Sequence, residues 1–149
     1  AIIFAKMGGM IDITTGASKY TDPYKSVLYA LESGASIDNI TFSSDGNAGL
    51  DKVDDENNLI GFKSAPFDKN LEEVINLHKI GGLSLENSLK LITSNPAKNL
   101  GLKSKGHVKV NYDADLCFFD SNLKLTGVVA NGKVMMRDGE LLVKGSFEK

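Results

Sequence analysis

The stretch that decides how this chain folds is Ile40-Thr41-Phe42-Ser43-Ser44-Asp45-Gly46-Asn47. Its apolar and small residues predict a short buried strand, which stops at the carboxylate of Asp45. Small residues follow as far as Gly49. Proteins of the α/β class present catalytic groups in this way, on loops at the carboxyl ends of strands. Taken alone, the stretch also fits an aspartate that merely closes a turn, because Asp-Gly is common in turns.

A strand, a helix and a second strand are predicted around this stretch. Residues 10–16 are rich in β-branched side chains and predict the first strand. Asp22 and Pro23 predict a helix start, since aspartate is a common N-cap and proline suits the first helical position. Residues 37–44 form the second predicted strand. This spacing predicts two parallel, neighbouring strands joined by the helix.

Two aspartates fall on these two strands. Asp12 lies in the middle of the first strand, whereas Asp45 lies at the carboxyl end of the second. Only Asp45 is therefore placed where chemistry is expected, and it is the candidate catalytic residue.

The segment from Asp45 to about Phe67 is predicted to be a long irregular loop. Loops longer than about 12–15 residues in a compact domain are usually functional or disordered. The acidic residues of this loop lack the spacing of an EF-hand, which disfavours a calcium site. We expect a solvated acidic loop with a hairpin turn at Asn57-Asn58. The acidic residues are Asp51, Asp54, Asp55 and Glu56.

A helix is predicted after Pro66. Asn70 and Glu73 have the spacing of a capping box, and an apolar stripe follows them. His78 lies near the predicted end of the helix, where a cationic imidazole is favoured by the helix dipole. A metal-binding role for His78 is the lesser alternative.

Two shorter helices are predicted next, and then the character of the sequence changes. Ser84 is the predicted N-cap of the first. Asn95 and Pro96 are the predicted cap and first residue of the second, which ends at Gly101. From about residue 103 the pattern is one of strands and turns. We therefore place a domain boundary near Gly101.

The C-terminal third is predicted to be a small antiparallel β unit. Val108 and Val110 alternate with a lysine, and residues 115–119 predict a buried strand. Asn131-Gly132 lies between two apolar pairs, which is the strongest short hairpin signal. Asp138-Gly139 repeats that signal before the last apolar run.

Composition narrows the class of protein. The 149 residues are 42% hydrophobic and 24% charged, with a net charge of −2, so a basic nucleic-acid-binding surface is not expected. The lone Cys117 stands in an apolar run and predicts a core thiol in a reducing compartment. No apolar run approaches the ~20 residues of a membrane span, and residues 1–5 lack the features of a secretory leader. The chain starts without Met in what resembles a helix end, so we expect a piece of a longer protein.

Four stretches resemble the C-terminal part of the amidohydrolase superfamily, whose members are metal-dependent hydrolases. They are Thr41-Phe42-Ser43-Ser44-Asp45, Thr93-Ser94-Asn95-Pro96-Ala97-Lys98-Asn99-Leu100-Gly101-Leu102, Lys105-Gly106-His107 with Asp113-Ala114-Asp115-Leu116, and Val129-Ala130-Asn131-Gly132-Lys133-Val134. Within the superfamily, further stretches resemble the isoaspartyl (β-aspartyl) dipeptidases. These are Gly8-Gly9-Met10-Ile11-Asp12-Ile13-Thr14, Ser43-Ser44-Asp45-Gly46-Asn47 and Val143-Lys144-Gly145-Ser146-Phe147-Glu148.

The resemblance implies an α/β fold: the C-terminal portion of a TIM-like (β/α)8 barrel plus a small antiparallel β-sandwich domain. Residues 1–101 would be the last βα units of the barrel, and residues 102–149 the C-terminal strands of the sandwich. A complete barrel needs about 250 residues. The resemblance therefore implies a fragment that is inactive without the missing N-terminal part.

The resemblance also implies a role for Asp45. In the family, the matching aspartate touches a metal ion and acts as general base and acid. It takes a proton from the metal-bridging hydroxide and passes it to the leaving amine. The implied cofactor is dinuclear Zn²⁺, whose remaining ligands lie outside this chain, because His78 and His107 do not match ligand positions.

Two positions depart from the family pattern. The substrate-contacting serine of the family falls at Gly49, which is the implied substrate-binding position but lacks a hydroxyl. The glycine that usually precedes the Asp-Ala-Asp-Leu run falls at Asn111. Asparagine tolerates a positive φ, so we expect the turn to survive.

The implied function is a cytoplasmic metallopeptidase, a metalloprotease of the dipeptidase type, that hydrolyses β-aspartyl dipeptides. One alternative is another amidohydrolase, dihydroorotase-like or a deacetylase. A second is a non-catalytic β-rich assembly domain built on residues 103–149. The missing part of the barrel is the expected partner, with no nucleic acid and no membrane. Homo-oligomerisation is also expected, because a partial barrel exposes strand edges.

Overall fold

The computed structural model describes residues 1–16, 21–46, 48–65 and 67–145. The chain divides into two compact units, Ala1–Leu100 and Gly101–Lys149. The first is an α/β unit and the second is built on one antiparallel sheet. The features predicted at Asn47, at Pro66 and at residues 146–148 lie outside the described residues.

The predicted strand–helix–strand unit is confirmed. Strands β1 (Ile11–Thr14) and β2 (Ile40–Ser43) pair in parallel, and helix α2 (Pro23–Glu32) joins them in sequence. The second strand begins three residues later than predicted, because the 3₁₀ turn η1 (Ile37–Asn39) precedes it. The hydroxyl of Ser36 accepts a backbone N–H of this turn at 3.3 Å and so favours the turn over a strand.

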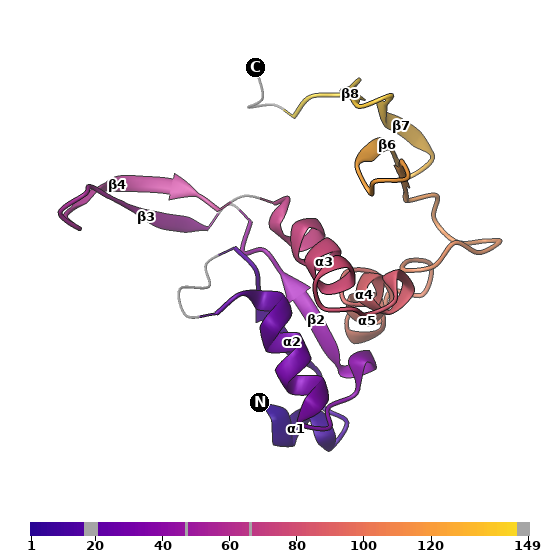
Figure 1. Ribbon diagram of the computed structural model, residues 1–149. Helices are drawn as coiled ribbons and strands as arrows, with labels where there is room; N and C mark the ends of the chain where they lie inside the picture. Colours follow the sequence, from indigo (N-terminus) through magenta and orange to yellow (C-terminus); the bar gives the residue numbers. More distant parts are fainter. Residues whose placement is uncertain (17–20, 47, 66, 146–149) are drawn as a thin grey trace. The chain divides into compact units, whose positions relative to one another are not determined.

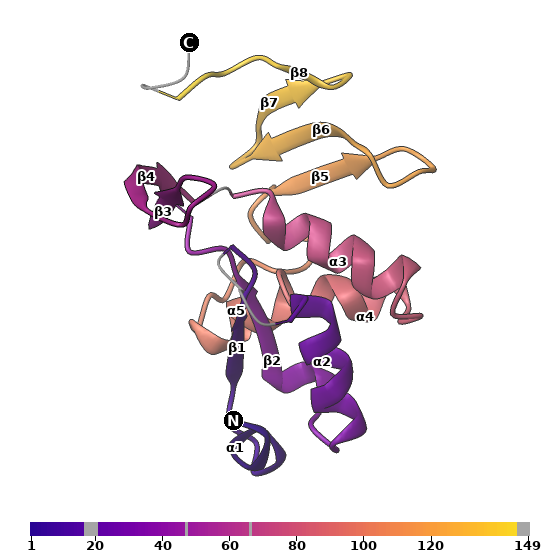
Figure 2. The same cartoon turned by 60° about the vertical axis from the view of Figure 1, so that its left-hand side comes forward.

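The apolar face of the strand pair carries the core of the first unit. The helices that cover it are α2, α3 (Lys69–Lys79) and α4 (Leu85–Lys90), which lie together beside the strands in Figure 2. Helix α1 (Ile2–Lys6) adds Ala5 to this core. The buried core residues are Ala5, Val27, Ala30, Ala35, Ile40, Phe42, Val74, Leu77 and Leu91.

The capping box predicted for α3 is wrong. The helix starts two residues earlier than predicted, with Asp68 at the N-cap, so Asn70 and Glu73 lie inside it. The side-chain oxygen of Asn70 instead accepts a hydrogen bond from the Thr15 hydroxyl, at 2.7 Å between the two oxygen atoms. The buried Glu73 accepts the backbone N–H of Tyr24, in the first turn of α2, at 2.8 Å. Each side chain binds a distant segment because tertiary packing brings that segment within reach.

Other predicted helix caps have mixed outcomes. Ser84 caps α4 as predicted, accepting the N–H of Asn87 at 3.2 Å. Asp22 holds the N-cap position of α2, but its carboxylate pairs with Lys25 at 2.7 Å and makes no capping bond. The local sequence was therefore sufficient to predict the cap at Ser84. At Asp22 the carboxylate pairs with the nearby Lys25 instead of capping the helix.

The cap predicted at Asn95 is wrong. Helix α5 (Ser94–Asn99) begins before it, with Thr93 at the N-cap, and the helix ends at Leu100 close to the predicted end. The buried Asn95 amide donates to the carbonyl oxygens of Ile37 and Ile40, at 2.8 and 2.7 Å. Those two carbonyl groups flank the start of β2, so Asn95 supports the strand rather than its own helix.

The prediction of an irregular loop after Asp45 is wrong. Most of it forms a hairpin of β3 (Gly49–Val53) and β4 (Leu59–Ser64), which projects from the first unit in Figure 1. A hairpin is present as predicted, but its turn lies at Asp55-Glu56 and not at Asn57-Asn58, because the Asn57 N–H donates to the Asp54 carbonyl oxygen at 3.0 Å. The carboxylate of Asp54 accepts the N–H of Asn58 at 2.8 Å. Cross-strand backbone bonds formed on both sides of this turn supply the order that the sequence pattern did not show.

Four antiparallel strands form the second unit, in the spatial order of their sequence. They are β5 (Leu116–Phe119), β6 (Leu125–Ala130), β7 (Lys133–Arg137) and β8 (Glu140–Leu141). Both predicted hairpin turns are confirmed. The residues of Asn131-Gly132 have φ of 48° and 75°, and those of Asp138-Gly139 have 52° and 83°, as a type I′ turn requires.

The strand predicted at residues 115–119 is confirmed as β5, but the burial predicted for it is wrong. Phe118 is 51% exposed, and Cys117 is an exposed free thiol rather than a core residue. Val108 and Val110 are 88% and 84% exposed in a segment without strand structure. The physical reason is that this sheet has little core of its own: among the described residues of the second unit, only Gly127 is buried.

Candidate functional site

Asp45 lies two residues beyond the end of β2, at the carboxyl end of the parallel pair. Its side chain is exposed and its backbone is left-handed, with φ of 48°. The carbonyl oxygen of Asp45 accepts the N–H of Ala48 at 2.8 Å and closes the turn. The backbone of Asp45 therefore closes the turn, and its side chain is exposed.

The two residues before Asp45 are held by the end of β1. The carbonyl oxygen of Ser43 accepts the backbone N–H of Thr15 at 2.7 Å and lies 3.2 Å from the Thr15 hydroxyl, which donates to it. Gly16 packs so closely on Ser44 that an added Cβ would overlap the Ser44 carbonyl oxygen. Neither of these contacts depends on a special motif, and sequence reasoning missed both.

The residue after Asp45 is also tightly packed. The ring of Phe67 lies against Gly46, where an added Cβ would overlap it. Phe67 follows the β3–β4 hairpin, so the hairpin leaves and returns beside Asp45. The N–H of Ala65 donates to the carbonyl of Ala48 at 2.9 Å and closes the base of the hairpin.

The implied substrate-binding position, Gly49, is the first residue of β3 and pairs with Ser64. An added Cβ at Gly49 would meet no heavy atom within 4 Å, so a side chain would fit there. The lack of a hydroxyl at this position is thus not imposed by crowding. The second departure behaves as expected, since Asn111 has φ of 67° and keeps the turn.

Each of the two histidines makes contacts within its own unit. The Nδ1 atom of His78 lies 2.7 Å from the Leu83 carbonyl oxygen, to which it donates, and His78 is near the end of α3 as predicted. His107 lies in the second unit with its ring edge-on to Tyr112, the centroids 6.2 Å apart. Across the part of the chain that the structure describes, no three His, Cys, Asp or Glu side chains gather to hold a metal. The residues present therefore do not fit a metal centre by themselves.

An ion-pair cluster links two stretches of the second unit that carry the family resemblance. Lys105 contacts Asp113 at 3.1 Å and also pairs with Asp115, which accepts the N–H of Asn131 at 2.7 Å. Hydrogen bonds from Lys105 lower the pKa of both aspartates, and they raise the pKa of the lysine. All three side chains are substantially exposed, so the cluster organises a loop and is not a reactive site.

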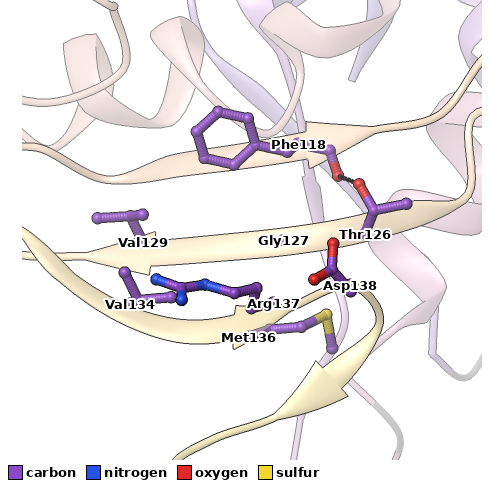
Figure 3. A pocket seen from close by; sticks show the side chains of 8 residues that line it. All are labelled: Phe118, Thr126, Gly127, Val129, Val134, Met136, Arg137 and Asp138. Atoms are coloured by element: carbon purple, nitrogen blue, oxygen red, sulfur yellow. Dashed lines mark hydrogen bonds between the residues drawn. The ribbon is translucent and has the colours of Figure 1, made fainter.

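The sheet of the second unit has a shallow concavity of about 300 Å³, shown in Figure 3. Its lining is mainly apolar and includes Phe118, Val129, Val134 and Met136. The Thr126 hydroxyl on its floor donates to the Phe118 carbonyl at 3.1 Å. Cys117, which precedes Phe118 in the chain, is exposed but partly desolvated, and this desolvation raises the pKa of its thiol and disfavours a reactive thiolate. The concavity thus has the character of an uncovered packing face.

Comparison with known proteins identifies the family of this chain. The sequence model of the amidohydrolase family matches residues 4–135. This chain belongs to the amidohydrolase family. No helix among the described residues of this amidohydrolase chain is long and apolar enough to cross a membrane.

Solved structures of amidohydrolases resemble the chain over nearly its entire length. A β-aspartyl dipeptidase from Fervidobacterium islandicum AW-1, in complex with β-Asp-Leu dipeptide, is 32% identical with a TM-score of 0.80, covering 99% of this chain and 39% of that one. A second structure of a β-aspartyl dipeptidase from the same organism is 28% identical with a TM-score of 0.78, covering 99% of this chain and 36% of that one. An N-acetylglucosamine-6-phosphate deacetylase from Pasteurella multocida is 19% identical with a TM-score of 0.64, covering 86% of this chain and 37% of that one. At this identity it shows the fold alone. The chain thus spans less than two fifths of each enzyme's length.

Proposed function

We propose that this chain is the C-terminal part of a metal-dependent hydrolase that cleaves β-aspartyl dipeptides. The observation that carries the proposal is the similarity to the Fervidobacterium dipeptidase, which was solved with β-Asp-Leu bound and which matches 99% of this chain. The position of Asp45 supports it further, because an outward carboxylate at a parallel-strand end is placed for chemistry.

Asp45 is the proposed general base and acid of the reaction. Its carboxylate takes a proton from the attacking water and delivers it to the leaving amine. The left-handed backbone at Asp45 turns the chain sharply after β2, and the packed residues on both sides fix that turn. A dinuclear zinc centre is part of the proposal, with Asp45 as one ligand and the others supplied from outside this chain; among the described residues no three His, Cys, Asp or Glu side chains gather.

The two units correspond to parts of two domains in this proposal. Residues 1–101 are the last βα units of a (β/α)8 barrel, supported by a parallel pair with one apolar face under helices. Residues 102–149 are the C-terminal strands of a small β-sandwich, supported by the antiparallel sheet of β5 to β8. Each unit lacks structure that the missing N-terminal part would supply, so the chain alone is expected to be inactive.

The setting of the protein belongs to the same proposal. A cytoplasmic location is supported by the single cysteine, which leaves no intrachain disulfide to form. Homo-oligomerisation is supported by the exposed apolar side chains of the β3–β4 hairpin, among them Phe62 and Ile60.

The test is an assay of the complete protein that contains this chain on a β-aspartyl dipeptide. Asp45→Asn keeps the size of the side chain but removes its basicity, so turnover should fall by at least about 10²-fold. Asp38→Asn is a matched control at the opposite end of β2, where the carboxylate only pairs with Lys90 at 3.1 Å. A chelator should abolish activity and zinc should restore it. Near-normal turnover by Asp45→Asn would refute the assigned role.

A substrate panel separates this proposal from its alternative. Gly49 offers no hydroxyl to the substrate, which leaves room for another amide or acetyl substrate. The panel contains a β-aspartyl dipeptide, dihydroorotate and an N-acetyl sugar phosphate. A kcat/KM that is highest on either of the last two would replace the dipeptidase assignment.

A further inference from the structure

Asp12, which the sequence places in the middle of β1, is bonded to the strand that leads to Asp45. In the parallel register Asp12 lies opposite Thr41. The Thr41 hydroxyl donates to one Asp12 carboxylate oxygen at 2.6 Å, and the Ser43 hydroxyl donates to the other. One carboxylate therefore holds two successive side chains on the same face of β2, since residues two apart in a strand share a face.

This face differs in kind from the opposite one. Ile40 and Phe42, which alternate with Thr41 and Ser43, are buried in the core under the helices. On the hydroxyl-bearing face Thr41 is only 4% exposed. The hydrogen bonds to Asp12 hold the side chains of this face, while apolar packing holds those of the other.

Ser43 is held from a second direction as well. Its carbonyl oxygen accepts the Thr15 N–H at 2.7 Å, while its side chain donates to Asp12. Only Ser44 separates Ser43 from the left-handed turn at Asp45. Because the backbone of Ser43 is anchored by both its side chain and its carbonyl, the direction in which the chain enters that turn is fixed.

We propose that Asp12 is a positioning residue for Asp45, acting through the hydroxyl of Ser43. The inference rests on the proposed function, in which Asp45 is the proton-transferring carboxylate. Asp12 does not touch the reacting atoms. It orients the strand end from which the Asp45 side chain is presented, and displacements of about 1 Å at such a group can cost about 10²-fold in rate.

The test uses the complete protein with the variants Asp12→Asn and Ser43→Ala and the control Asp38→Asn. Both test variants should lower kcat about 10- to 100-fold while KM changes less than about 2-fold, and zinc content should be unchanged. The control should stay within about 2-fold of wild type, because its surface ion pair contributes little. The double variant should be no slower than the slower single variant, since both changes break one interaction.

Conservative rescue and a substrate-independent readout complete the test. Ser43→Thr keeps the hydroxyl and should recover most of the turnover lost in Ser43→Ala. Amide hydrogen exchange of residues 44–46 should be about 10-fold faster in Asp12→Asn than in the control. If Asp12→Asn does not fold, Ser43→Ala, which removes only the donor, carries the same measurements.

The outcomes separate this inference from the function on which it rests. If wild type is active and Asp45→Asn is not, but Asp12→Asn and Ser43→Ala turn over like the control, the positioning role is wrong and the function stands. Multiplicative losses in the double variant would also overturn action through Ser43. If wild type fails to cleave the dipeptide, the function is wrong, and the exchange rates of residues 44–46 alone decide whether Asp12 holds the strand end.

Discussion

Glu73 offers the most direct test of how the helices of the first unit are held together. Glu73 is 7% exposed, and its carboxylate accepts two hydrogen bonds, from the Tyr24 N–H at 2.8 Å and from the Asn76 side-chain amide at 3.1 Å. Tyr24 lies in the first turn of α2, where backbone N–H groups lack helical partners. Glu73 on α3 therefore caps α2 across the helix–helix contact.

The magnitude follows from these contacts. Removing a charged acceptor from a partly buried N–H costs about 1.5–3 kcal/mol, and losing a negative charge at a helix N-terminus adds roughly 0.3–1 kcal/mol. Glu73→Ala should thus destabilise α2 by about 2–4 kcal/mol. Glu73→Gln retains one acceptor oxygen and should cost only about 1 kcal/mol.

Amide hydrogen exchange of α2 is the assay, because it reports local opening of one helix. The predicted loss for Glu73→Ala corresponds to exchange faster by about 30-fold to several hundredfold, taking 1.4 kcal/mol per factor of ten. Glu72→Ala is the matched control, since Glu72 is exposed and pairs with Lys69 on the same helix. This variant should change the free energy of opening of α2 by less than about 0.5 kcal/mol. Equal exchange rates in the two alanine variants would refute the capping argument.

Three further predictions concern other single contacts. Asn95→Ala removes the amide that binds two backbone carbonyls at β2, so it should lower the free energy of unfolding by about 2–4 kcal/mol in urea denaturation, whereas Asn99→Ala, at an exposed position, should change little. Gly16→Ala forces the chain away from Ser44 and should lower turnover of the complete protein; unchanged kcat would show that this close approach is dispensable. Lys105→Met should raise the pKa of Asp115 toward the ordinary aspartate value, as measured by NMR titration of its carboxylate. In the wild type, the loop should stay ordered above the ordinary aspartate pKa. It should lose its order only as the pH falls through the lowered pKa of Asp115.

Local sequence signals predicted the features that depend on a few neighbouring residues. Asn131-Gly132 specifies its hairpin because both residues adopt the positive φ that the turn demands. Ser84 caps its helix because its hydroxyl reaches a backbone N–H three residues away. The parallel pair around Asp45 was also predictable, because the length and pattern of the intervening helix restrict the connection.

The failures share a physical cause. Glu73, Asn95 and Asp12 bind partners that lie 49, 55 to 58, and 29 to 31 residues away in the sequence. No local pattern marks such a partner, so the capping motifs assigned to the first two were displaced by stronger tertiary contacts. The buried strand expected around Cys117 failed for the opposite reason, because an apolar run is buried only where another surface covers it.

The sequence by itself determined that Asp45 follows a parallel strand, since β-branched residues, a helix start at Asp22-Pro23 and an Asp-Gly turn follow one another in the required order. Only the tertiary structure decided what holds Asp45 there. Its backbone turns through φ of 48°, between Gly16 packed on Ser44 and Phe67 packed on Gly46. Those contacts arise from register and packing between distant segments, which the order of residues along one strand does not specify.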